Sequence, residues 1–144
     1  MTAAEAGGYS PLGLAYLGDA VFEQLVRERL VLGGNAPTDK YMGKAKNYVS
    51  AAAQSRFYSL LEPFLTESEL AVMKRGRNAK GHGTTKRAKN TKKTISSSMI
   101  DYRRATGVEA LFGYLYLLGQ AERIAELFEA CWGTGGLRPP MNNE

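Results

Sequence analysis

Apolar residues recur every three or four positions along most of the chain, which is the spacing of one face of an α-helix. The first such run covers residues 12–32 and stops at Gly33 and Gly34, because consecutive glycines end helices. A second run follows Pro37, with Thr38 as the expected N-cap, and predicts one helix to about residue 61. The first half of the chain is therefore expected to form two long helices.

Three more helices are expected in the rest of the chain. A short helix begins at Thr66, where the sequence TESE forms a capping box with Glu69. Two further helices cover about residues 99–118 and 121–131. No segment alternates apolar and polar residues as a strand would, and no internal repeat is present. The predicted fold class is all-α, in a single domain over residues 1–144.

The composition is that of a folded protein, and it narrows the possible chemistry. Hydrophobic residues make up 44% of the chain and charged residues 23%. No apolar run approaches the ~18 residues that a membrane span needs, and the first residues lack a signal-peptide pattern, so we expect a cytoplasmic protein with no membrane partner. The chain has one cysteine, Cys131, and one histidine, His82. An internal disulfide, a Cys/His zinc site and a Ser-His-Asp triad are therefore excluded.

Positive charge is concentrated in one segment. Residues 74–93, KRGRNAKGHGTTKRAKNTKK, contain nine Lys or Arg and no acid, although the net charge of the whole chain is only +5. Because the segment also contains three glycines, we expect a long cationic loop rather than an amphipathic helix. A polyanion such as nucleic acid would neutralise this loop. The alternative is a solvated loop with no partner.

Two acids, Asp19 and Glu109, interrupt the apolar residues of their helices, and each has a glycine nearby, Gly18 and Gly113. A glycine inside a helix costs ~1 kcal/mol relative to alanine, so these two indicate close backbone approach. If the helices cross there, the carboxylates lie close together, and a divalent cation such as Mg²⁺, which prefers carboxylate and phosphate oxygens, relieves their repulsion. Glu23 lies one helical turn after Asp19 and could stand beside this site. The alternative is that each acid is partly exposed at the margin of its helix.

Four segments resemble those of a known family, in the same order. LAYLGDAVFE (14–23) resembles the signature helix of the ribonuclease III catalytic domain, and TGVEALFGYLYL (106–117) resembles its second acidic helix. VSAAAQ (49–54) and RGRNAK (75–80) resemble segments of the compact bacterial branch called Mini-ribonuclease III. The resemblance extends over nearly the whole chain, and it implies the ribonuclease III catalytic fold, assembled as a homodimeric helical bundle.

The resemblance also assigns site residues. It places Asp19 and Glu109 at the metal-binding, catalytic carboxylates of the family. Full-length members carry further acids where this chain has Ala15 and Thr106, and the Mini-ribonuclease III branch lacks both, so the number of metal ions is left open. Thr106 and Glu23 are expected to lie next to the two metal-binding carboxylates. With no separate double-stranded-RNA-binding domain expected, the basic segment would bind RNA through Lys74, Arg75, Arg77, Asn78, Lys80, Lys86, Arg87 and Lys89.

The function implied by the resemblance is that of a Mg²⁺-dependent endoribonuclease. It would hydrolyse phosphodiesters in double-stranded RNA, leaving 5′ phosphates and 3′ hydroxyls, with two sites of a homodimer cutting opposite strands. The resemblance points to maturation of the ends of the large-subunit (23S) ribosomal RNA precursor. The alternative is a catalytically inert, ribonuclease III-like protein that binds RNA or assists ribosome assembly, since two of the family's four acids are absent.

Overall fold

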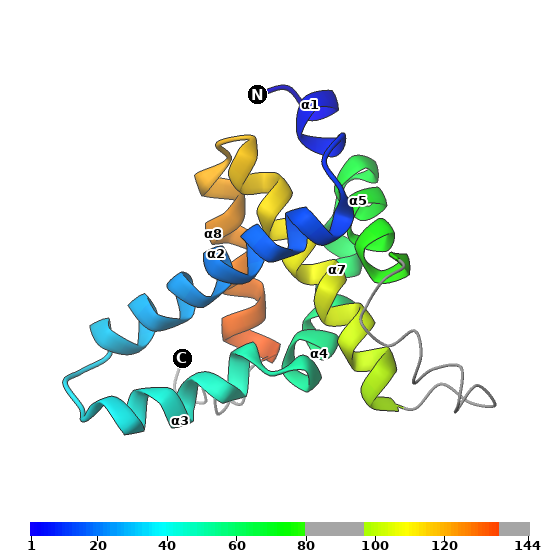
Figure 1. Ribbon diagram of the computed structural model, residues 1–144. Coiled ribbons are helices and arrows are strands. Elements are labelled where there is room, and N and C mark those ends of the chain that lie inside the picture. Colours follow the sequence, from blue (N-terminus) through cyan, green and yellow to red (C-terminus); the bar gives the residue numbers. More distant parts are fainter. Residues whose placement is uncertain (80–96, 136–144) are drawn as a thin grey trace.

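The computed structural model describes residues 1–79 and 97–135. Within these ranges the chain forms helices and no strands, which confirms the all-α fold class. None of the described helices is long and apolar enough to cross a membrane. In chain order the elements are α1 (Ala3–Gly7), α2 (Pro11–Leu32), α3 (Thr38–Val49), α4 (Ala51–Leu61), the 3₁₀ turn η1 (Glu62–Phe64), α5 (Glu67–Asn78), α7 (Ser97–Leu117), α8 (Ala121–Ala130) and the π-helical turn η2 (Cys131–Gly135) (Figure 1).

Helix α7 runs through the middle of the bundle, with α2, α4 and α5 packed around it (Figure 1). Its residues 105–108 and 110–115 are all buried. A helix covered on several sides buries consecutive positions instead of a single stripe. This explains why α7 carries the run VEALFGYLYL, in which only Glu109 is charged.

Phenylalanine rings join four helices at the centre of the core. The ring of Phe22 on α2 lies 5.9 Å from that of Phe57 on α4, 5.2 Å from that of Phe112 on α7 and 5.5 Å from that of Phe128 on α8. The last two contacts are edge-to-face, an arrangement that aromatic rings favour. This cluster holds α2, α4 and α8 at fixed positions around α7.

The helix expected between residues 38 and 61 is two helices, α3 and α4. Ser50 between them is extended, with φ −68° and ψ 158°, and its hydroxyl accepts a hydrogen bond from the backbone N–H of Ala53 at 3.2 Å. Ser50 is therefore an N-cap, and it ends one helix while starting the next. The expected cap at Thr38 is also wrong, because the N-cap position is Pro37, which gives no side-chain bond.

The expected capping box at the start of α5 is confirmed, but the expected end of this helix is wrong. The Thr66 hydroxyl accepts a bond from the N–H of Glu69, and the Glu69 carboxylate accepts one from the N–H of Thr66. The helix then continues to Asn78, so residues 74–78 are helical rather than part of a loop. Gly76 does not break the helix, because it is buried where α5 meets α7: a Cβ on Gly76 would lie 2.9 Å from Cβ of Ala110.

Helices α2 and α7 cross in backbone contact at Gly18 and Gly113, as the sequence predicts. A Cβ added to Gly18 would lie only 1.6 Å from the carbonyl oxygen of Glu109, and one added to Gly113 would lie 2.1 Å from that of Leu14. Real Cβ atoms do not approach backbone this closely. Any larger residue at either position would push the two helices apart.

We predict that Gly18→Ala lowers the free energy of unfolding by about 3 kcal/mol, because the clash is with backbone that cannot move aside. Urea unfolding followed by circular dichroism measures this loss.

Gly43→Ala is the matched control. Gly43 lies on an exposed part of α3 with no atom within 4 Å of an added Cβ, so its replacement should stabilise the protein by up to ~1 kcal/mol. Equal unfolding free energies for the Gly18 variant and the original protein would contradict the close crossing.

Candidate active site

The crossing of α2 and α7 brings Asp19 and Glu109 together. Asp19 follows Gly18 directly, and the carbonyl of Glu109 is the group that faces Gly18 across the crossing. The two carboxyl groups are in hydrogen-bond contact. The two acids therefore form one pair, although 90 residues separate them in the sequence.

The pair lies at the margin of the core rather than inside it. The buried positions of α2 are Leu14, Ala15, Gly18, Phe22 and Val26. Asp19 is one position away from this stripe and is exposed, whereas Glu109 is half-buried. The alternative that the sequence left open, an acid exposed at the margin of its helix, therefore holds for Asp19. Solvent reaches the pair from the side of Asp19.

The protonation of Glu109 is strongly perturbed at this position. Burial of Glu109 and, after it, the nearby Asp19 carboxylate raise the pKa of Glu109 to about 8. The pair consequently keeps a proton near neutral pH, which is characteristic of two acids that share a site. A cation bound at the pair would displace this proton.

The donors of the pair fit a hard divalent cation. They offer carboxylate oxygens, the ligands that Mg²⁺ prefers, and Mg²⁺ commonly binds to one or two carboxylates while keeping several waters. In the ranges 1–79 and 97–135, no cluster of three or more His, Cys, Asp or Glu residues is present. A metal bound here would therefore complete its coordination with water and substrate oxygens.

Glu23 and Thr106, the two further residues expected around the site, have other contacts. The Glu23 carboxylate accepts bonds from Arg27 one turn further along α2, the shorter at 2.7 Å. The Thr106 hydroxyl is buried and donates to the carbonyl of Tyr102 at 2.9 Å. Their role around the carboxylate pair stays a prediction.

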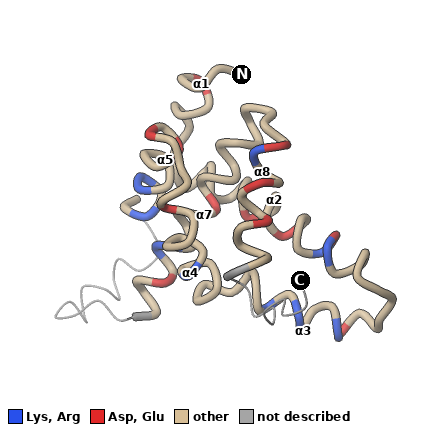
Figure 2. The backbone as a smooth tube through the Cα atoms, turned by 180° about the vertical axis from the view of Figure 1, so that it is seen from behind, with Lys and Arg blue, Asp and Glu red and all other residues tan. Residues whose placement is uncertain are grey.

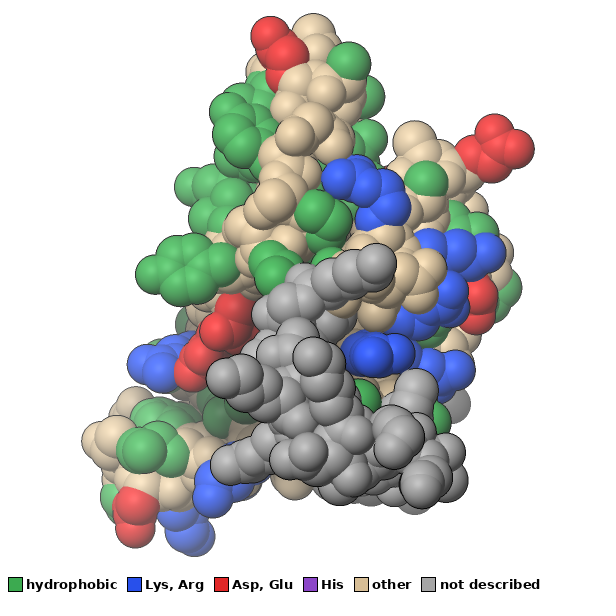
Figure 3. Space-filling view, turned by 45° about the vertical axis from the view of Figure 1, so that its right-hand side comes forward, with side chains coloured by type: hydrophobic (Ala, Val, Ile, Leu, Met, Phe, Trp, Pro, Cys, Tyr) green, Lys and Arg blue, Asp and Glu red, His purple; other side chains and the backbone are tan. Residues whose placement is uncertain are grey.

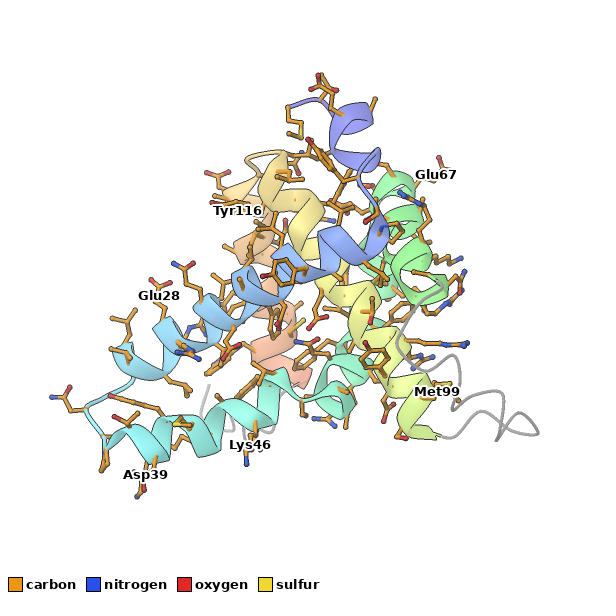
Figure 4. The ribbon with its side chains drawn as sticks, in the orientation of Figure 1. Glu28, Asp39, Lys46, Glu67, Met99 and Tyr116 are labelled. Atoms are coloured by element: carbon orange, nitrogen blue, oxygen red, sulfur yellow. The ribbon has the colours of Figure 1, made fainter. Side chains whose placement is uncertain are left out.

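The first four of the expected RNA contacts lie in the last turns of α5. Figure 4 labels Glu67 at the start of α5 and Met99 near the start of α7, so α5 ends beside the first half of α7. Gly107 of α7 marks the contact: a Cβ there would lie 2.6 Å from the carbonyl oxygen of Met73. Gly107 precedes Glu109 by two residues, so α5 packs against the stretch of α7 that carries Glu109.

These four residues are not equally free. Lys74 is exposed, and Asn78 is exposed but its side-chain oxygen accepts a hydrogen bond from Arg77 at 3.0 Å. Arg75 donates to the carbonyls of Gly7 and Tyr9 and so ties α5 to the chain segment before α2. Arg77 donates to the Tyr58 hydroxyl at 3.0 Å. The other expected contacts, Lys80, Lys86, Arg87 and Lys89, lie outside the described residues.

Sequence reasoning missed three arginines on the neighbouring helices, namely Arg56 of α4 and Arg103 and Arg104 of α7. Figure 2 shows basic positions at the end of α5 and in the first turns of α7, on one side of the bundle. In the view of Figure 3, basic side chains gather on the right, and acidic side chains lie left of the centre. The three arginines lie outside the basic run of the sequence, so only the packing of α4 and α5 against α7 assembles this basic surface.

Comparison with known proteins gives the same fold and family. Residues 12–120 match the model of the ribonuclease III domain. A protein of Symbiobacterium thermophilum named Mini-ribonuclease 3 is 48% identical over 83% of this chain and 85% of its own length, and one of Brevibacillus brevis is 46% identical over 83% of each. A crystal structure of a Fusobacterium nucleatum protein superimposes with a TM-score of 0.69 at 29% identity, covering 84% of this chain and 86% of its own. With this match and the carboxylate pair at the crossing of α2 and α7, the chain belongs to the ribonuclease III family.

Proposed function

We propose that this endoribonuclease cleaves double-stranded RNA by metal-assisted hydrolysis at Asp19 and Glu109. The contact of these two carboxyl groups at the crossing of α2 and α7 is the observation that carries the proposal. Membership of the ribonuclease III family supports the substrate class and the metal dependence. Ala15 and Thr106 are both buried and uncharged, so the proposed metal site has two carboxylates instead of four.

Each acid of the pair has a distinct role in the proposed reaction. Mg²⁺ bound at the pair supplies a Lewis acid that activates water and offsets charge developing on the phosphate. Asp19 is exposed and holds its oxygens where a phosphodiester can approach from solvent. Glu109 is half-buried, and it must give up its proton to become a ligand, which its raised pKa opposes below about pH 8. No side chain of the protein serves as nucleophile, and the products carry 5′ phosphates and 3′ hydroxyls.

The cellular substrate that we propose is the precursor of the large-subunit (23S) ribosomal RNA, processed in the cytoplasm. The sequence resemblance to the Mini-ribonuclease III branch supports this, as do relatives named Mini-ribonuclease 3 at 38–48% identity. The carboxylate pair favours an active enzyme over an inert RNA-binding protein, because ionisation of both acids is unfavourable in the folded protein unless a cation is bound.

We also propose that the enzyme is a homodimer formed through the outer face of α2. Tyr16 is 87% exposed and Leu12, one turn earlier, is also exposed. Apolar side chains gathered next to a functional site commonly mark a contact surface. Because Asp19 lies on the same helix, a second copy bound here would stand beside each carboxylate pair.

We predict that Asp19→Asn and Glu109→Gln each reduce the cleavage rate of long duplex RNA in Mg²⁺ at least about a hundredfold, because each removes a charged metal ligand. Binding of the duplex, measured by filter retention, should persist. Glu28→Gln is the control, since Glu28 is an exposed acid of the same helix (Figure 4) and should leave cleavage unchanged. Cleavage by either ligand variant at the original rate would show that the residue is not part of the site.

A second prediction concerns the protonation of Glu109 and its effect on Mg²⁺ binding. Because the folded-state pKa of Glu109 is raised to about 8, the neutral form stabilises the fold, and this stability is lost as pH rises from about 5 through 8. Mg²⁺ binds the ionised pair, so its affinity should increase over the same range, with release of up to one proton per binding event below pH 8.

Calorimetric titration of Mg²⁺ in buffers of different ionisation enthalpy measures this proton release. The Glu109→Gln variant should release no proton from this position, because glutamine does not ionise. Equal Mg²⁺ affinity of the original protein at pH 6 and pH 9 would contradict a shared proton in the pair.

The proposed homodimer predicts sedimentation near twice 15.7 kDa at micromolar concentration. Tyr16→Asp should shift the protein towards the monomer, because a charge in an apolar contact is poorly tolerated. Phe64→Asp is the control: Phe64 is 63% exposed in η1, away from α2, and should leave the dimer intact. A monomeric original protein that still cuts both strands would contradict the two-site arrangement.

A further inference from the structure

A polar hollow lies between α4 and the first turns of α7. Its volume is about 550 Å³, and its polar lining consists of Ser55, Arg56, Ser59, Asp101 and Arg104. It is an open depression rather than an enclosed cavity. The hollow therefore suits part of a long ligand better than a whole small molecule.

The Arg104 guanidinium in this hollow is held in place. It donates to the Ser59 hydroxyl at 3.2 Å and lies over the Tyr58 ring, 5.3 Å from its centroid. Arg77 of α5 lies 5.6 Å from the same ring centroid and donates to its hydroxyl. Burial raises the pKa of Tyr58, so the phenol stays neutral and adds no negative charge. One tyrosine thus fixes two cationic groups on neighbouring helices.

The arginines of this region have no acidic partner among the residues that the structure describes. Three arginines elsewhere are paired with acids: Arg27 with Glu23, Arg29 with Glu129, and Arg123 with Glu69 and Glu126. Within the described parts of the chain, no carboxylate forms an ion pair with Arg56, Arg77 or Arg104. Unpaired guanidinium groups beside hydroxyl groups are suited to phosphate oxygens.

We propose that this hollow binds the ribose-phosphate backbone of the RNA substrate at a phosphate other than the one cleaved. Arg56 and Arg104 contact the phosphate, assisted by the Ser55 and Ser59 hydroxyls, and the Asp101 carboxylate accepts a hydrogen bond from a ribose 2′-hydroxyl. This inference rests on the proposed function, because it takes duplex RNA as the substrate.

The geometry of α7 separates this contact from the carboxylate pair. Arg104 precedes Glu109 by five residues, which corresponds to about 7.5 Å along the helix axis and about 140° around it. A single phosphate therefore cannot contact both the hollow and the carboxylate pair. A carboxylate beside two arginines also disfavours a small, highly charged anion, whereas a 2′-hydroxyl needs such an acceptor and is present in RNA alone.

The test measures duplex RNA binding in the Glu109→Gln background, which prevents cleavage. The double variant Arg56→Gln, Arg104→Gln should raise the dissociation constant roughly tenfold. It should also lower the slope of log affinity against log salt by up to about 2, because each phosphate contact contributes a little less than 1. Arg56→Gln alone, at an exposed position, should give about half of the change in slope.

The control is Lys40→Gln, Lys44→Gln, which removes the same charge from exposed positions of α3, near its turn with α2 (Figure 1). Affinity and salt slope should then be unchanged. If the arginine variants behave like this control, the hollow does not contact RNA. If the Glu109→Gln protein binds no duplex RNA at all, the proposed function itself is wrong.

Asp101→Ala tests the ribose contact separately. It should reduce the preference for duplex RNA over duplex DNA of the same sequence, measured as the ratio of the two dissociation constants. An unchanged ratio would overturn the assignment of the 2′-hydroxyl to Asp101.

Discussion

The backbone contact between α2 and α7 is the constraint on which the rest of the structure depends. At Gly18 and Gly113 the two helices approach until there is no room for a single Cβ atom. Helices with ordinary side chains at the crossing pack 8–10 Å apart, and only glycine permits a closer approach. This contact fixes Asp19 and Glu109 as neighbours, so the same two glycines that would weaken isolated helices create the carboxylate pair.

The pair is electrostatically unfavourable in the folded protein, and the surrounding core holds it together. Burial and Asp19 favour the protonated form of Glu109, which means that the fold tolerates one negative charge at the pair more readily than two. The Phe22 cluster lies one turn from Asp19 and joins α2 to three other helices. The helices therefore cannot separate to relieve the repulsion, and the fold keeps the acids where a cation would stabilise them.

A second glycine seam positions the basic surface. Gly76 of α5 and Gly107 of α7 bring those helices together in the same way, two residues from Glu109. The end of α5 and the first turns of α7 then lie side by side, and Tyr58 of α4 holds one arginine from each. Because α7 takes part in both seams, it carries Glu109 at its crossing with α2 and packs against the end of α5 along its first half.

The sequence by itself determined the helical class, the approximate bounds of α2, α7 and α8, the capping box at Thr66 and the two acids with their glycines. These features depend on local spacing and on residue types whose backbone preferences are strong. The sequence was misleading at Ser50 and Gly76. A serine in an alanine-rich run, or a glycine in a basic run, looks the same in the sequence whether the helix continues or stops there. At Gly76 the neighbouring helix decides the outcome, because α7 leaves no room for a side chain there. The exposure of Asp19, the proton on Glu109 and the meeting of Arg56 and Arg104 across one hollow likewise depend on the angles at which helices cross, and no local pattern in the chain encodes those angles.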